Sequence, residues 1–225
     1  MVVLAFFPLR DENPTALKPI INWLLLLSNI IVFLWLFSDG PELVDETING
    51  FGFVPARALE NGEYYRFFSS IFLHAGFAHL FGNMLFLWIF GDNIEDACGH
   101  LSYVFFYSVT GVFASLGFAL TTPDLTSVAV GASGAISGIL GGYVVLFPRA
   151  RVLTGIPFGY VAFYVPAYVM IIGWFLWQLA LLPLALQGLG GVAYGAHIGG
   201  FIAGVALIKI FQRRIPGRAS PYNVA

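Results

Sequence analysis

Six apolar stretches alternate along the chain with segments that are polar or rich in helix-breaking residues. They cover residues 20–37, 78–91, 101–120, 133–147, 160–182 and 192–211. No Asp, Glu, Lys or Arg lies inside the first, third, fourth or fifth stretch. Apolar runs of about 20 residues without charges are typical of membrane-spanning helices. The pattern therefore predicts an all-α, polytopic membrane protein with six transmembrane helices.

Composition indicates the same class. Of the 225 residues, 59% are hydrophobic and only 10% are charged, whereas about 25% are charged in a typical soluble domain. So few charges cannot solvate the surface of a compact globule, which excludes a water-soluble protein. The net charge of −2 provides no basic surface for nucleic acid. Because six helices use most of the chain, we expect one membrane domain over residues 1–225, with short tails at about 1–19 and 212–225.

Lysine and arginine are unevenly divided between the two sides of the predicted membrane domain. Eight lie on one side: Arg10, Lys18, Arg149, Arg151, Lys209, Arg213, Arg214 and Arg218. Only Arg57 and Arg66 lie on the other. Cationic loops stay in the cytoplasm, so we expect both termini there and the loop at 38–76 outside. The small size and the lack of a targeting signal favour the inner membrane of a bacterium.

Polar side chains inside apolar stretches are candidates for function, because burying them in lipid is costly. The candidates are His79, Asn83, Ser133, Ser137, Gln178 and His197. His79 and Asn83 are four residues apart and share one helical face. A single amide such as Gln178 is expected to hydrogen-bond between helices. His74 and His100 lie at the ends of stretches, where we expect them to face water.

Ser133 and His197 are predicted to lie at the same depth. Each precedes an arginine at the expected cytoplasmic surface, Arg149 or Arg213, by 16 residues. At about 1.5 Å per residue, both side chains lie roughly 24 Å from that surface. In a hydrocarbon layer about 30 Å thick, they are several ångströms below the outer boundary. The fourth helix is too short to cross alone, so the chain before Ser133 requires a hydrated cavity open to the outside.

The sixth stretch repeats small residues every four positions, a pattern that lets helix backbones touch. A histidine at position 197 could then reach the hydroxyl of Ser133, placing a base beside a weak nucleophile. No carboxylate in the stretches could orient the imidazole, so the prediction is a Ser–His dyad and not a triad. His79 and Asn83 would supply hydrogen bonds to a developing oxyanion. Alternatively, His197 bonds a backbone carbonyl, and His79 and Asn83 only clamp helices together. A zinc site is disfavoured, because His79 and His197 have no third ligand.

Segments from residue 51 to 211 resemble the rhomboid family of intramembrane serine proteases. The main ones are EYYRFFS at 63–69, HAGFAHLFGNM at 74–84, GASGA at 131–135 and AHIGG at 196–200. The resemblance implies that Ser133 is the nucleophile and His197 the base, without a cofactor. It implies an oxyanion site made by His79, Asn83 and the backbone N–H of Ser133. The remaining motif positions it implies are Tyr65 and Arg66, which structure the first loop, and Gly131, Gly200 and Gly204.

Two positions depart from the family's pattern. Ser137 stands where many members carry an aromatic residue stacked on the catalytic histidine, so the imidazole here is held without that ring. Tyr65 stands where the first-loop motif usually has tryptophan, which keeps an amphipathic ring at the interface.

The prediction is a serine endopeptidase that cleaves the transmembrane segments of single-pass client proteins through an acyl-enzyme. Membrane lipid is the other expected partner. One alternative is a catalytically inactive rhomboid-like protein that binds such clients, although inactive relatives typically lack the serine or histidine that this chain has. Another is a small transporter or channel, which would call for inverted repeats or charged residues at mid-depth. The sequence does not indicate the client, its cleavage site or the oligomeric state.

Overall fold

The chain is predominantly helical in a computed structural model that describes residues 7–38, 40–155, 161–189 and 191–213. The helices are α1 (Ile20–Leu36), α2 (Pro41–Phe51), α3 (Pro55–Leu59), α4 (Arg66–Ser69), α5 (Phe77–Cys98), α6 (His100–Thr121), α7 (Ser133–Leu146), α8 (Ala167–Leu186) and α9 (Tyr194–Phe211). A 3-10 turn, Ser70–Phe72, follows α4. Each of the six apolar stretches overlaps one of the long helices α1 and α5–α9, although α5 and α8 end seven and four residues later than their stretches.

Length and composition make three or four of these helices candidate membrane spans. The helices α6, α8 and α9 are each long and apolar enough to cross a membrane. A fourth span results if α5 is joined to the segment Arg66–Phe72 across a bend of 98°. With 17 and 14 residues, α1 and α7 are shorter apolar helices. The prediction of a helical protein with apolar helices long enough to cross a membrane is thus confirmed. That six helices cross the membrane stays a prediction.

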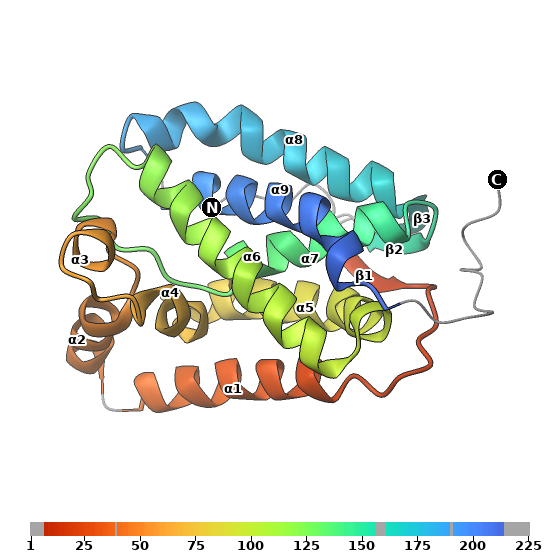
Figure 1. Cartoon of the computed structure of the whole chain (residues 1–225), viewed down its shortest axis with the longest axis horizontal. Helices are drawn as coiled ribbons and strands as arrows, with labels where there is room; N and C mark the ends of the chain where they lie inside the picture. The colour runs from red at the N-terminus through yellow and green to blue at the C-terminus, as the bar shows by residue number, and fades with distance from the viewer. Residues whose placement is uncertain (1–6, 39, 156–160, 190, 214–225) are drawn as a thin grey trace.

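The long helices lie side by side with α7 among them (Figure 1). Helix α7 packs against α5, α6, α8 and α9, and almost all of its residues are buried. By contrast, α8 runs along one edge of the bundle (Figure 1) and buries only Ala167, Ile171 and Gln178. The helix that begins at Ser133 is therefore the central element of the fold, and α8 is loosely attached.

Glycines bring the backbones of α7 and α9 into direct contact. A Cβ atom added at Gly200 would lie 2.0 Å from the carbonyl oxygen of Gly134. A Cβ at Gly204 would lie equally close to the carbonyl oxygen of Gly138. No side chain fits in either place, so both positions require glycine.

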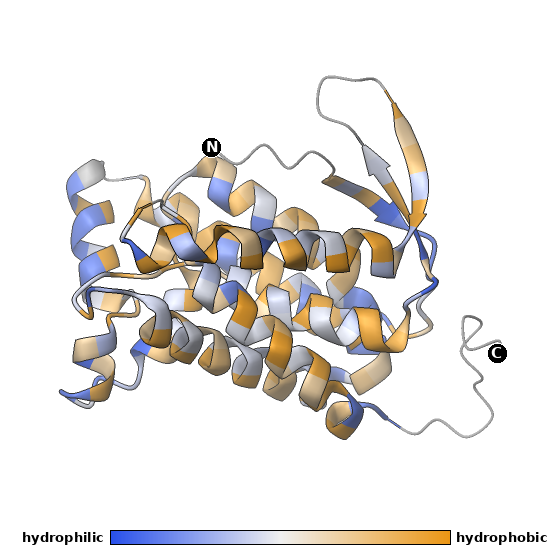
Figure 2. Cartoon of the chain, turned by 90° about the horizontal axis from the view of Figure 1, so that it is seen from above, coloured by the Kyte–Doolittle hydropathy of each residue, from blue (hydrophilic) through white to orange (hydrophobic). Residues whose placement is uncertain are grey.

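Three short antiparallel strands form a sheet in the order β1-β2-β3, which the all-α prediction missed. They are β1 (Phe7–Asp11), β2 (Arg151–Gly155) and β3 (Ala162–Pro166). The hydropathy pattern instead predicts the N-terminal tail at the position of β1 and the fifth helix at the position of β3. Hydropathy does not separate a five-residue apolar strand from part of a helix, and the pairing of β1 with β2 joins distant segments. The hairpin of β2 and β3 projects from one end of the bundle (Figure 2). The predicted tail residues 1–6 and 214–225 lie outside the described residues.

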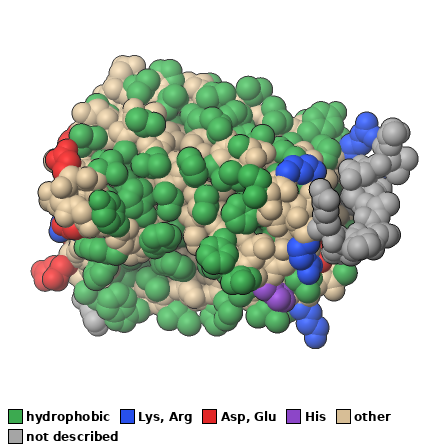
Figure 3. All heavy atoms as spheres, viewed as in Figure 1, with side chains coloured by type: hydrophobic (Ala, Val, Ile, Leu, Met, Phe, Trp, Pro, Cys, Tyr) green, Lys and Arg blue, Asp and Glu red, His purple; other side chains and the backbone are tan. Residues whose placement is uncertain are grey.

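The surface has an apolar middle and charged ends. Hydrophobic side chains cover the middle of the face shown in Figure 3, with acidic groups at one end and lysine and arginine at the other. Large apolar side chains such as Leu24, Phe81 and Leu176 are more than half exposed. Water would not solvate so large an apolar surface, whereas lipid does.

Candidate active site

The structure brings Ser133 and His197 into hydrogen-bonding contact. Ser133 begins α7, and His197 lies in the first turn of α9. The Ser133 Oγ atom is 2.9 Å from Nε2 of His197. Both residues are half-buried, so they lie in the bundle without being sealed. The contact follows from the close packing of α7 on α9, because each residue lies near the glycine contact between these helices.

A tight turn at Gly131 prepares the start of α7. Its φ angle of 120° is in the region that favours glycine, and its N–H donates to the carbonyl oxygen of Ser70 (2.9 Å). A Cβ here would come within 2.6 Å of Nε2 of His79. The N–H of Ile136 donates to the carbonyl oxygen of Ala132, so the N–H groups of the preceding first turn have no partner within the helix. Among the described residues no backbone acceptor bonds these N–H groups, which suits them to bind an anion.

His79 and Asn83 of α5 lie beside this turn. The ring of His79 approaches Gly131, and the Asn83 amide nitrogen is 3.7 Å from the position of a Cβ there. Asn83 Nδ2 also donates to the carbonyl oxygen of His79 (3.0 Å). An amide nitrogen carries two hydrogens, so one of them is left for another acceptor. Polar side chains of α5 thus lie next to the turn that leads to Ser133.

The expectation that His74 faces water is wrong. His74 is fully buried, with its ring centroid 5.0 Å from that of His79. It lies where the chain bends by 98° into α5, and this bend turns the ring inward. His100 is partly exposed, as expected, and contacts Glu95.

Helix α8 supplies two further contacts to His197. Gln178 Oε1 is 2.8 Å from Nδ1 of His197, and the Trp174 ring centroid is 5.8 Å from the imidazole centroid. The expected interhelical hydrogen bond of Gln178 is confirmed, and its partner is His197, the candidate base, which the sequence pattern does not indicate. The available signal was that Gln178 is the only amide side chain of its apolar stretch. The hydroxyl of Ser137, at the position where an aromatic ring would otherwise support the imidazole, donates to the carbonyl oxygen of Ser133 (2.6 Å).

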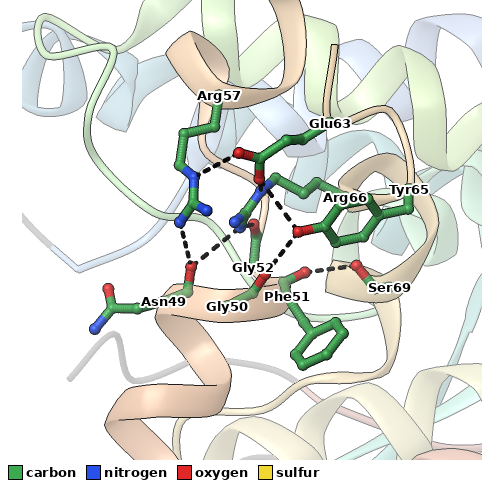
Figure 4. A network of polar contacts seen from close by, with 9 residues as sticks. All are labelled: Asn49, Gly50, Phe51, Gly52, Arg57, Glu63, Tyr65, Arg66 and Ser69. Carbon is green, nitrogen blue, oxygen red and sulfur yellow. Dashed lines mark hydrogen bonds and ion pairs between the residues drawn. The ribbon is translucent and has the colours of Figure 1, made fainter. Parts of the chain in front are cut away.

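The first loop is organised around a buried arginine (Figure 4). The Arg66 side chain is fully buried; its Nε donates to Glu63 (2.5 Å) and its Nη1 to the carbonyl oxygen of Gly52 (2.7 Å). Arg57 and the Tyr65 hydroxyl also donate to Glu63, at 3.1 and 3.2 Å. These donors, with Arg66 first, hold the pKa of the Glu63 carboxyl below its usual value. Arg66 thus joins the segment 49–52 to Glu63 within the first loop.

The described residues contain no group of three His, Cys, Asp or Glu side chains that could hold a metal ion. The site combines the Ser133 hydroxyl in contact with the His197 imidazole, the N–H groups of the first turn of α7, and the nearby side chains of His79 and Asn83.

Comparison with known proteins decides the family. A Rhomboid domain model matches residues 61–214, more than half of the chain, and this range contains both Ser133 and His197. The chain belongs to the rhomboid family. Rhomboid proteins are generally intramembrane proteases, and the apolar helices of this rhomboid protein agree with an integral membrane location.

Three named relatives align with this rhomboid protein. The rhomboid protein YdcA of Bacillus subtilis is 34% identical over 143 residues, which are 60% of this chain and 68% of YdcA. Rhomboid protease GluP of the same organism is 33% identical over 138 residues, 60% of this chain and 27% of GluP. The mitochondrial Rhomboid protein 1 of Saccharomyces cerevisiae is 36% identical over 161 residues, 65% of this chain and 44% of the relative. This rhomboid protein thus spans less than half the length of the last two.

Proposed function

We propose that this protein is an intramembrane serine endopeptidase that cleaves transmembrane segments of single-pass client proteins. The observation that supports it most is the 2.9 Å contact between Ser133 Oγ and His197 Nε2. It places a general base within reach of the proton of a nucleophile. The nearby N–H groups and the side chains of His79 and Asn83 suit the negative charge of an acyl-transfer transition state.

The proposed reaction has two steps. Ser133 Oγ attacks the client's carbonyl carbon while its proton passes to Nε2 of His197. The tetrahedral oxyanion is stabilised by the Ser133 N–H, His79 and Asn83. The C–N bond then breaks, and the imidazolium gives its proton to the leaving amine. In the second step, His197 takes a proton from a water whose oxygen attacks the ester carbon. The acyl C–O bond then breaks, and the imidazolium returns the proton to Ser133 Oγ.

An intact client helix hides its carbonyl groups in hydrogen bonds, so cleavage requires local unwinding. Gly, Ser or Pro near the scissile bond would make unwinding easier, and a small residue such as Ala would ease access to it. We propose that clients enter past α8 and the segment 183–191. Helix α8 buries only three residues, so its displacement breaks few contacts.

The membrane arrangement is also part of the proposal. We place α1 and α5–α9 across the membrane, with both termini in the cytoplasm and the end that carries α2 and α3 outside. The collection of lysine and arginine at the opposite end (Figure 3) supports this orientation. At about 21 Å, α7 is shorter than the hydrocarbon layer, so Ser133 would lie below the outer boundary. A C-terminal reporter fusion in a bacterial inner membrane tests the orientation.

The test uses the full chain in liposomes with a model single-span substrate and a fluorophosphonate probe. We expect cleavage and labelling in the wild type, and neither in Ser133→Ala or His197→Ala. Ser115→Ala, which removes a buried hydroxyl from α6, serves as the matched control and should behave as wild type. Cleavage by Ser133→Ala would refute the proposal. A wild type that binds the substrate without probe labelling would instead indicate an inactive client-binding protein.

A further inference from the structure

The imidazole of His197 is held by α8, the loosely packed helix at the edge of the bundle. Gln178 is only 5% exposed and is the one polar side chain among the three that α8 buries. Its Oε1 is 2.8 Å from Nδ1 of His197. The other ring nitrogen, Nε2, faces Ser133 Oγ at 2.9 Å. Each nitrogen of the ring therefore has one partner, and the two partners come from different helices.

The amide of Gln178 has a defined orientation. Its Nε2 points to the carbonyl oxygen of Trp174 at 3.5 Å, one turn earlier on α8. An N–H group suits that carbonyl, so the oxygen is the end of the amide that faces His197. A carbonyl oxygen only accepts hydrogen bonds, so the proton of the neutral ring has to be on Nδ1. Nε2 then presents its lone pair to the hydroxyl of Ser133, the form a general base needs.

We propose that Gln178 is a positioning residue for His197: it selects the Nδ1–H tautomer and fixes the rotation of the imidazole toward Ser133. The role in catalysis rests on the protease function proposed above. Being neutral, the amide orients the ring without adding a counter-charge to the imidazolium, unlike the carboxylate of a serine-protease triad. The Trp174 ring, tilted by 36° to the imidazole, limits its rotation from the side. Alignment of the base thus depends on α8 being seated against α9.

Kinetic measurements on the full chain in liposomes test the role. Gln178→Met keeps the length of the side chain and removes the acceptor. We expect kcat to fall by about tenfold or more, a part of the roughly 10²–10⁴ that a positioned general base contributes, with KM little changed. Gln178→Glu restores an oxygen acceptor and should recover most of kcat. Gln212→Met makes the same chemical change at the exposed end of α9 and should match wild type. Wild-type kcat in Gln178→Met, or no recovery in a folded Gln178→Glu, would overturn the proposal.

Nitrogen NMR of labelled histidine reads the tautomer directly and needs no protease activity. The His197 signals are identified by their absence in His197→Ala. At a pH where the ring is neutral, we expect the proton on Nδ1 in wild type and Gln178→Glu, and a shift of population toward Nε2–H in Gln178→Met. An unchanged tautomer in Gln178→Met refutes the positioning role. If Gln178→Met does not fold, loss of the Nδ1–H form in Gln178→Glu refutes it instead. A wild type without cleavage or probe labelling refutes the protease function, while the tautomer still decides the role of Gln178.

Discussion

Replacing Gly200 with alanine tests whether the contact of α7 with α9 creates the candidate active site. The added methyl would lie 2.0 Å from the carbonyl oxygen of Gly134 and 3.0 Å from its carbonyl carbon. Both atoms belong to the backbone, so neither can rotate away. Gly134 follows Ser133 directly, and His197 lies one turn before Gly200. A displacement here therefore acts on both groups of the dyad.

The size of the displacement follows from the contact. Ordinary van der Waals contact for a Cβ begins at 3.4 Å, so the helices must separate by about 1.4 Å locally. If only half of this reaches the site, the 2.9 Å between Ser133 Oγ and His197 Nε2 becomes about 3.6 Å, beyond a hydrogen bond. A misplacement of this order lowers catalysis about a hundredfold. Overpacking of this kind also destabilises a fold by about 1–3 kcal/mol.

Two measurements check the prediction: cleavage of the model substrate, and thermal unfolding followed through the thiol of Cys98. Cys98 is the single cysteine and is only 1% exposed, so a thiol-specific reagent labels it when the protein unfolds. Gly173→Ala on α8 is the matched control, because a Cβ there meets nothing within 4 Å. Gly200→Ala should lose activity and unfold earlier, and Gly173→Ala should do neither. Equal activity and stability in the two variants would refute the close packing of α7 on α9.

Three other predictions concern parts of the fold outside the dyad. Arg66→Leu removes the buried donor to Glu63 and to the carbonyl oxygen of Gly52, and the unpaired carbonyl should cost about 1–3 kcal/mol in thermal or denaturant unfolding. Arg57→Leu, at a 44% exposed side chain, should cost clearly less, and equal losses would contradict the loop geometry. Burial, opposed by the hydrogen bond from Tyr143, raises the pKa of Asp11 to about 7 from 3.8. The folded state therefore binds the proton more tightly, and the free energy of unfolding should fall as pH rises from about 4 to 7 and then level off. Asp11→Asn should reduce this pH dependence in melting curves, and an unchanged dependence would contradict the assignment. The Glu95 carboxylate accepts hydrogen bonds from the backbone N–H groups of Ile21 and Asn22 at the start of α1. Glu95→Gln should therefore increase hydrogen exchange in the first turn of α1. Unchanged protection there would contradict this capping role.

The sequence by itself was sufficient for the class of protein, the approximate positions of the six long helices and the candidate chemistry. Solvation by lipid is a property of each segment alone, so hydropathy locates such helices without knowledge of their neighbours. Ser133 at the start of a short apolar stretch and His197 among glycines are likewise recognisable from the residues around each of them. Equal distances from the flanking arginines predicted their common depth, and in the structure Ser133 and His197 are in contact.

Tertiary structure decided the features that depend on distant partners. The sheet joins residues 7–11 to residues 151–155, and neither strand has a local pattern that distinguishes it from tail or helix. His74 is buried because the chain bends sharply before α5, not because of its neighbours in sequence. The role we propose for Gln178 arises only when α8 packs against α9, since an isolated amide in an apolar helix does not indicate which group it will meet. Hydrophobicity acts on each segment separately, whereas a hydrogen bond requires two side chains at one place, and only packing brings them there.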